Sequence, residues 1–190
     1  MLTATIAAAV VMGTATIKDE FVCPVMGGPV REGNKSVEYA GKLYGSCCPG
    51  CEDKFAADPK KYIKDAIEKK RLIAYSLFDP ISRKRIEAKK AKAHTDYMGT
   101  RYYFESEANL KSFLKDPKKI SKVPAKESMK CAVMGTKIAS YSKALGGYVD
   151  HGDTRYYMCC VLCAPTMVKD PAKYAIKNGV APKALIIAAK

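Results

Sequence analysis

The residues of this chain most able to do chemistry are its cysteines, which number eight and fall into two separated clusters. In each cluster, two cysteines stand four positions apart, which places both thiols on one face at the start of a helix. A third cysteine lies upstream and can close the site from a loop. Three thiolates that converge in this way are typical of a structural zinc site or a soft copper site. The predicted ligands are Cys23, Cys47 and Cys51 in the first cluster, and Cys131, Cys159 and Cys163 in the second.

Other sulfur atoms accompany these ligands. Cys48 and Cys160 are each adjacent in sequence to a predicted ligand, while Met26 and Met134 follow the upstream cysteine of their cluster. All four are possible additional ligands. Because a thioether favours Cu⁺ over Zn²⁺, the sequence leaves the metal open between these two ions.

The composition excludes several other functions. The 190 residues are 48% hydrophobic, which is too apolar for a disordered tail. With only two histidines and no tryptophan, His-rich metal sites and His-dependent catalytic triads are nearly excluded. No paired carboxylates, Ser-His arrangement or glycine-rich phosphate loop stand out, so we expect a protein that is not an enzyme.

The net charge of +14 is unevenly distributed, and half of it lies in residues 79–130, which contain no cysteine. The basic run Arg83-Lys84-Arg85 could contact an acidic surface, but no recognisable nucleic-acid-binding motif accompanies it. The expected partners are therefore a metal ion and an acidic protein or metal transporter. We expect no binding to nucleic acid.

The first residues predict export. Residues 1–15 carry no charge and contain the apolar run 6–12, followed by small residues suited to a signal peptidase, although the usual basic start is missing. The run is too short to cross a bilayer, which needs about 20 apolar residues. We therefore expect a periplasmic or extracellular protein with a signal-peptide-like segment and no transmembrane span in the mature chain; a buried N-terminal helix or strand is the alternative.

Self-comparison divides the rest of the chain into three similar units. Each contains a Tyr-rich stretch followed by an Asp-Pro pair. The Tyr-rich stretch around a Gly or Asp turn predicts a β-hairpin. The Asp-Pro pair predicts the end of one helix and the start of the next, with Asp as N-cap and Pro at the first helical position. We predict an α+β fold of three small tandem units, at residues 20–74, 75–125 and 126–190.

The middle unit keeps this scaffold but has no cysteine. Where the first unit has its three predicted ligands, the middle unit has Asp79, Glu105 and Asn109. Cysteines that merely filled a core would be replaced by apolar residues. The polar replacements instead indicate a partly solvent-facing site that was lost or converted to oxygen ligands.

The motifs Cys23-Pro-Val-Met-Gly-Gly, Cys47-Cys48-Pro-Gly-Cys51 and Asp58-Pro-Lys-Lys-Tyr62 together have a recognisable pattern. They resemble the YHS domain, of the wider TRASH-like group associated with heavy-metal trafficking, resistance and sensing. The third unit is similar from Cys131 to Tyr174, and the middle unit is similar only in scaffold. The resemblance implies treble-clef-like zinc-finger units, each a β-hairpin plus helix, with the six predicted cysteines as metal ligands.

Two alternatives remain open from the sequence. In an exported protein the cysteines could be oxidised, which would make the chain a disulfide-stapled interaction module without catalytic activity. The spacings Cys48-Pro-Gly-Cys51 and Cys160-Val-Leu-Cys163 are also Cys-x-x-Cys pairs, as in thiol redox proteins, although no thioredoxin-like βαβ pattern surrounds them.

Overall fold

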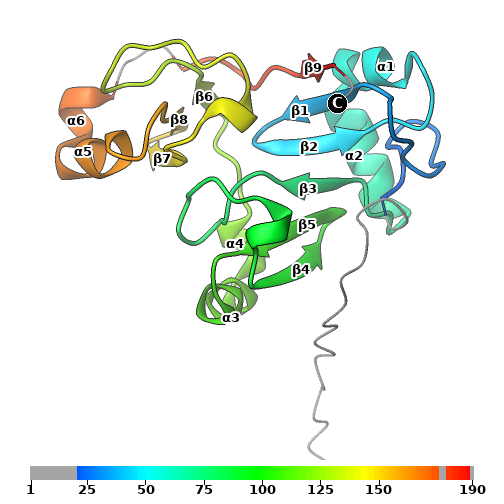
Figure 1. Ribbon diagram of the computed structural model, residues 1–190, viewed down its shortest axis with the longest axis horizontal. Helices are drawn as coiled ribbons and strands as arrows, with labels where there is room; N and C mark the ends of the chain where they lie inside the picture. The colour runs from blue at the N-terminus through cyan, green and yellow to red at the C-terminus, as the bar shows by residue number, and fades with distance from the viewer. Residues whose placement is uncertain (1–20, 176–178, 189–190) are drawn as a thin grey trace, which may run out of the picture.

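The computed structural model of the protein describes residues 21–175 and 179–188. It is a mixed α+β structure, which confirms the predicted fold class, and its three units follow one another around a central region (Figure 1). The predicted signal-like segment, residues 1–15, lies outside the described residues. Within the described ranges, no helix combines the length and apolar character needed to cross a membrane.

The first two units share one sheet. Each contributes a β-hairpin, and a short strand between the units, β3 (Ala74–Ser76), joins them by pairing antiparallel with β2 (Lys42–Gly45) and parallel with β5 (Thr100–Phe104). The six strands lie in the order β4-β5-β3-β2-β1-β9. Their bounds are β1 Ser36–Tyr39, β2 Lys42–Gly45, β3 Ala74–Ser76, β4 Ala93–Tyr97, β5 Thr100–Phe104 and β9 Leu185–Ile187.

The third unit has its own sheet of three strands, β6 (Lys126–Ser128), β7 (Tyr148–His151) and β8 (Thr154–Tyr157), in the order β6-β8-β7. Here β6 pairs parallel with β8, as β3 pairs parallel with β5 in the second unit. The two units therefore repeat the same arrangement of a leading strand and a hairpin, as their sequence similarity predicts.

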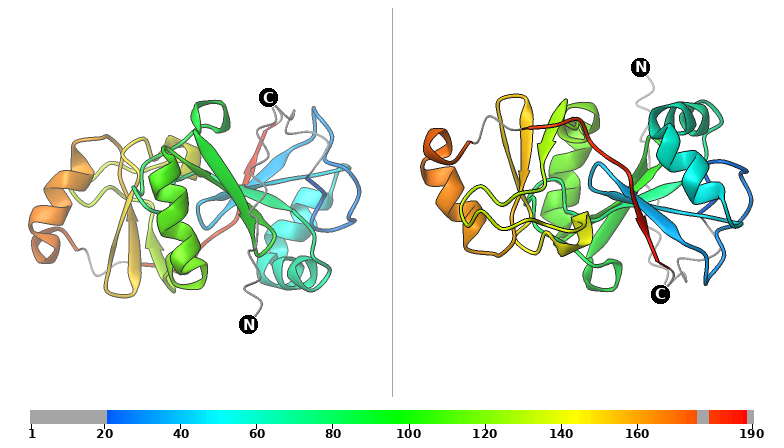
Figure 2. Two further views of the ribbon diagram at one scale, coloured as in Figure 1. Left: turned by 90° about the horizontal axis from the view of Figure 1, so that it is seen from below. Right: turned by 90° about the horizontal axis from the view of Figure 1, so that it is seen from above.

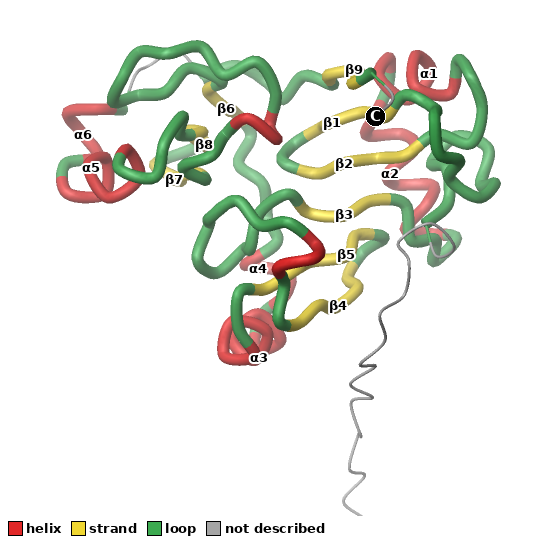
Figure 3. The backbone as a smooth tube through the Cα atoms, in the orientation of Figure 1, coloured by secondary structure: helices red, strands yellow, loops and turns green. Residues whose placement is uncertain are grey.

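Two helices follow each hairpin and meet at the Asp-Pro pair. The side chains of Asp58, Asp116 and Asp170 each accept a hydrogen bond from the backbone N–H three residues later, at 3.2, 3.0 and 3.2 Å. This confirms the predicted N-cap, with proline at the first helical position. The helices are α1 Cys51–Ala57, α2 Pro59–Glu68, α3 Glu107–Lys115, α4 Pro117–Ile120, α5 Cys163–Lys169 and α6 Pro171–Tyr174, with 3₁₀ turns η1 Ala88–Lys90 and η2 Tyr141–Lys143. Figure 3 shows that long loops connect these short elements.

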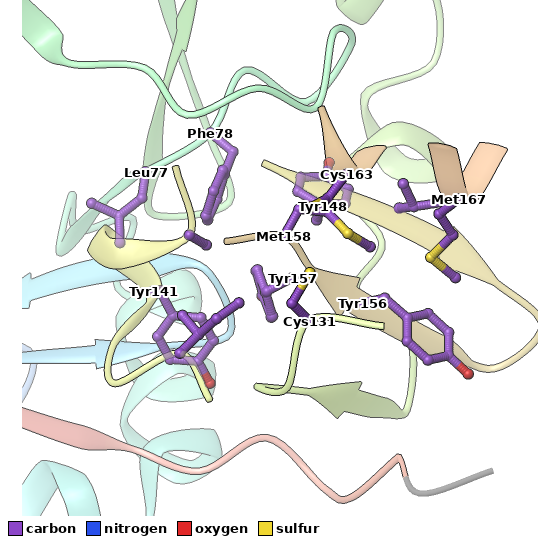
Figure 4. Packing of buried hydrophobic residues seen from close by; sticks show 13 residues of the cluster. Leu77, Phe78, Cys131, Tyr141, Tyr148, Tyr156, Tyr157, Met158, Cys163 and Met167 are labelled. Atoms are coloured by element: carbon purple, nitrogen blue, oxygen red, sulfur yellow. The ribbon is translucent and has the colours of Figure 1, made fainter. Parts of the chain in front are cut away.

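The units are packed together. Leu77 and Phe78, which follow β3, are buried in a cluster whose other fully buried members belong to the third unit. The Phe78 ring lies 5.5 Å from the ring of Tyr148 and 5.6 Å from that of Tyr157, measured between centroids (Figure 4). Burial of a phenylalanine of this kind contributes about 2–3 kcal/mol. The middle unit is thus anchored to the core of the third.

The C-terminal segment ties the third unit back to the first. Residues near Val180 pair with Glu127 in the third unit, and β9 then pairs antiparallel with β1. Figure 2 shows this segment, in red, running from the third unit to the hairpin of the first unit. We refer to residues 179–188 as the strap. Nothing in the repeat pattern predicts β9.

A buried carboxylate lies beneath the strap. Glu127 is 2% exposed, and its Oε1 accepts hydrogen bonds from the Tyr141 hydroxyl and from the backbone N–H of Lys183, while its Oε2 has no partner. Burial raises the pKa of Glu127, although these two hydrogen bonds and the charge of Arg155 act in the opposite direction.

This carboxylate predicts a pH dependence of stability. A carboxyl whose pKa is raised by folding binds its proton more tightly in the folded state, so its contribution to stability is present below the ordinary Glu value and is lost as the pH rises through the raised value. We expect the free energy of unfolding to fall more steeply with rising pH above 4.5, the ordinary value, in the wild type than in Glu127→Gln. Denaturant titrations across this range measure the difference, and parallel curves would contradict the prediction.

Candidate metal centres

The upstream cysteine of each cluster lies in a tight turn held by its own backbone. The Cys23 N–H donates to the carbonyl of Gly28, and the Gly27 N–H donates back to the carbonyl of Cys23, both at 2.8 Å. The turn needs the left-handed backbone of Gly27, whose φ is +74°. Cys131 is held in the same way, with Gly135 at φ +69°. We call these two segments the cysteine turns.

The other two cysteines of each cluster come from the end of the hairpin and the start of the following helix. Cys47 follows β2, and Cys51 is the first residue of α1. Cys159 and Cys163 hold the same places after β8 and at the start of α5. The cysteine turn, the end of the hairpin and the start of the helix thus each bring one thiol to the same point.

The three predicted thiols of each unit converge. Within each triad, all Sγ atoms lie within 4.8 Å of one another, and among the described residues these are the two groups of potential metal ligands that meet this condition. The triads, which we call the first-unit and third-unit centres, lie at opposite ends of the molecule, beside α1 and α5 (Figure 1). They therefore form two separate sites.

The spacing of the sulfur atoms fits a metal ion. Tetrahedral Zn²⁺ with Zn–S bonds of about 2.3 Å requires sulfur atoms about 3.8 Å apart. The Sγ atoms of Cys159 and Cys163 are 3.8 Å apart. In both centres, two of the three cysteines are closed off from water. The cysteine of the turn, Cys23 or Cys131, is fully buried, and the cysteine at the helix start, Cys51 or Cys163, is nearly so. The third cysteine, Cys47 or Cys159 after the hairpin, is half-buried and lies on the side of the centre that is open to solvent.

The cysteine turns favour a thiolate. Burial alone would raise the pKa of Cys23, but hydrogen bonds from the backbone at Met26, Cys47 and Val25 outweigh it, and the pKa is lowered overall. The pKa of Cys131 is lowered by the same balance. A buried thiolate that receives several backbone N–H groups is a preorganised anionic metal ligand.

The helix cysteines behave in the opposite way. Burial, and then the neighbouring thiols, raise the pKa of Cys51 and of Cys163 well above the ordinary thiol value. Three thiols so close together cannot all ionise unless a cation balances them. Each centre therefore has one thiolate prepared in advance and two thiols whose ionisation requires a positive charge, which a bound metal ion supplies.

The possible additional ligands lie around the rim of the centres. The Sγ of Cys48 is 3.8 Å from that of Cys47, and the Sγ of Cys160 is 3.1 Å from that of Cys163. The side chains of Met26 and Met134, in the cysteine turns, are 65% and 64% exposed. Neither methionine is packed into the protein, so both thioethers extend into solvent beside a centre.

In the middle unit, a hydrogen-bond network occupies the place that the cysteine triads have in the other two units. Asp79 is fully buried, so the expectation of a partly solvent-facing site is wrong at this position. Its Oδ1 accepts from the N–H groups of Ile81 and Ser82 at 2.8 and 3.2 Å, and its Oδ2 accepts from the N–H of Glu105 and the side-chain amide of Asn109 at 2.8 and 2.7 Å. One carboxylate thus joins the same three elements that the cysteines join in the other units.

Gly146 is a supporting residue that sequence analysis did not single out. A Cβ atom at this position would lie 2.0 Å from the carbonyl oxygen of Cys160. We expect Gly146→Ala to lower the free energy of unfolding by about 2 kcal/mol and to weaken Zn²⁺ binding at the third-unit centre, because the backbone between its ligands must move. Denaturant unfolding and competition with a chromogenic chelator measure both effects.

Gly28→Ala is the matched control, because a Cβ there would make an ordinary 3.6 Å contact with Cys47 in the first-unit centre. Equal losses in the two variants would show that the close approach at Gly146 has no special role.

Comparison with known protein families supports the likeness of the units. The family model of the YHS domain matches residues 21–66 and 77–120. The chain carries tandem YHS domains. Comparison with curated proteins and with solved structures found no significant match.

The two matched regions are the first and middle units, so the YHS scaffold here occurs with and without cysteines. The first YHS domain contains one cysteine triad, and the second contains the Asp79 network. The third unit, which repeats the strand, hairpin and two-helix arrangement beyond the matched regions, contains the other triad. The cysteine triads are therefore separable from the scaffold that positions them.

Proposed function

We propose that this protein binds two heavy-metal ions, one at each cysteine triad, and serves in metal trafficking, resistance or sensing as a protein without catalytic activity. The observation that carries the proposal is the convergence of three thiols, within 4.8 Å of one another, in each of two separate units. The match to the YHS domain, a family associated with heavy metals, supports it.

Zn²⁺ and Cu⁺ are the ions proposed for these centres, because both bind thiolates well. A turn, a hairpin and a helix start each supply one ligand, as in a treble-clef-like zinc finger. Met26 and Met134 extend beside the centres, and a thioether from either would favour Cu⁺.

The setting of this function is also a proposal. The uncharged residues 1–15 support export to the periplasm or the extracellular space. The basic middle unit supports docking to an acidic protein or a metal transporter, through charge complementarity. In this scheme the middle unit joins the two metal-binding units and provides the docking surface.

Metal analysis of the full chain tests the proposal. The protein is purified without added metal, and elemental mass spectrometry is combined with thiol titration before and after denaturation. We expect about two equivalents of zinc or copper per chain, with the ligand thiols protected until the protein unfolds. Absence of metal together with absence of free thiols would favour the disulfide-stapled alternative and overturn the proposal.

A further inference from the structure

The third-unit centre contains a thiol pair that is placed to form a disulfide. The Sγ of Cys160 lies 3.1 Å from the Sγ of Cys163, which is one of the three proposed metal ligands. The backbone N–H of Cys163 donates to the carbonyl of Cys160 at 3.1 Å and closes a tight turn. Such a turn holds its end Cα atoms within about 7 Å, a separation that disulfides span when their Cα atoms are about 4.4–6.8 Å apart.

This pair is accessible to a small oxidant. Cys160 is half-buried, and the two residues between the cysteines, Val161 and Leu162, are 70% and 74% exposed. The turn therefore lies at the surface, while Cys131 and Cys163 are buried beneath it. Cys159 and Cys160 are the half-buried thiols of this centre, and of the two Cys160 lies nearer to the Sγ of Cys163, at 3.1 Å against 3.8 Å.

The first-unit centre has the same Cys-x-x-Cys turn, but it is closed less tightly: the Cys51 N–H donates to the carbonyl of Cys48 at 3.4 Å, against 3.1 Å in the third unit. Its rim thiol, Cys48, lies 3.8 Å from Cys47, its neighbour in the chain. Adjacent Cα atoms are about 3.8 Å apart, which is shorter than disulfides normally span. Pairing of Cys48 with Cys47 is therefore disfavoured, and the tighter turn with its 3.1 Å sulfur contact makes Cys160 and Cys163 the pair that should oxidise first.

We propose that the third-unit centre is a redox-gated metal site, in which a peroxide joins Cys160 to Cys163 and releases the bound ion, while the first-unit centre keeps its ion. This inference rests on the proposed function, because it requires that a metal ion bind at Cys131, Cys159 and Cys163. It adds a condition under which that ion leaves.

The oxidation balances with hydrogen peroxide as the oxidant. The Cys160 sulfur attacks one peroxide oxygen, becomes a sulfenic acid and releases water, and the Cys163 thiolate then displaces hydroxide to form the S–S bond. Two sulfur atoms lose two electrons, the peroxide O–O bond takes them up, and the products are one disulfide, one water and one hydroxide. The centre is left with two thiolates, Cys131 and Cys159, which bind a metal ion more weakly than three.

Zinc release from the full chain tests the inference. The protein is loaded with Zn²⁺ and treated with hydrogen peroxide, and free zinc is followed with a chromogenic chelator while disulfides are mapped by peptide mass spectrometry. We expect one of two zinc equivalents to leave together with formation of a Cys160–Cys163 disulfide. In Cys160→Ser, which keeps all three proposed ligands, release should be at least about tenfold slower.

Cys48→Ser is the matched control, and it should release zinc as the wild type does. Release at an unchanged rate from Cys160→Ser, or a disulfide that joins other cysteines, would overturn the inference while leaving the metal sites intact. If the chain bound no zinc at the third unit, the proposed function would fail instead. The metal-free protein then gives a separate reading, since the Cys160–Cys163 disulfide should still be the first to form.

Discussion

Replacing Asp79 by alanine is expected to lower the free energy of unfolding by about 3 kcal/mol and to leave the amount of bound metal unchanged. The fully buried carboxylate accepts hydrogen bonds from three backbone N–H groups and from the amide of Asn109. Its removal leaves these donors without partners, and each buried donor that loses its partner costs about 1–3 kcal/mol. Urea unfolding of the metal-loaded proteins, with zinc content measured in parallel, provides both readouts.

Asp96→Ala is the matched control within the same unit. The Asp96 carboxylate is 46% exposed and pairs with Arg101 on the hairpin, so its loss should cost about 1 kcal/mol or less. A loss of zinc from Asp79→Ala, with stability unaffected, would mean that the middle unit binds metal through this carboxylate. The network would then not be a structural replacement for a metal centre.

Replacing Cys51 by serine should remove one bound metal equivalent, and replacing Cys163 by serine should remove the other. Each thiol is nearly fully buried and begins the helix that follows its hairpin, so its loss removes one of the three converging ligands of its centre. A serine oxygen is a poor ligand for Zn²⁺ and for Cu⁺ compared with a thiolate. The double variant should bind no metal, as measured by elemental mass spectrometry.

The rim cysteines supply the control for this pair of variants. Cys48→Ser and Cys160→Ser change thiols adjacent to the triads, and each protein should keep two metal equivalents. Full stoichiometry in the Cys51→Ser, Cys163→Ser double variant would contradict the assignment of both centres. Loss of both equivalents in either single variant would instead show that the two ends of the molecule are coupled.

Local chemistry explains why the repeated architecture could be predicted from the sequence. The Asp-Pro pair fixes a helix start through contacts that span only three residues, and the structure confirms this cap in all three units. The hairpins follow in the same way from Tyr-rich strands and a short turn. The four-residue spacing of Cys47 and Cys51 predicts two thiols on one helix, which is wrong in detail: α1 begins at Cys51 and Cys47 lies in the loop after β2, so the spacing joins a hairpin end to a helix start.

Features that depend on distant contacts could not be predicted. The repeat pattern shows only what the three units share. It therefore carries no information on the strap, which has no counterpart in the other units. The burial of Phe78 among residues of the third unit could not be predicted either, because this contact joins residues that are far apart in sequence. At Asp79, the polar residue suggested exposure, whereas four donors from three segments make its burial possible.

The pairing of β9 with β1 has a consequence for the order in which the protein can be completed during synthesis. Ser36 in β1 lies opposite Ile187, so the first hairpin acquires its outer neighbour only after the second and third units have left the ribosome. Until then the outer edge of β1 has unpaired backbone groups, which can template pairing with another chain. Nascent or truncated chains that lack the last strand should therefore be the aggregation-prone forms of this protein.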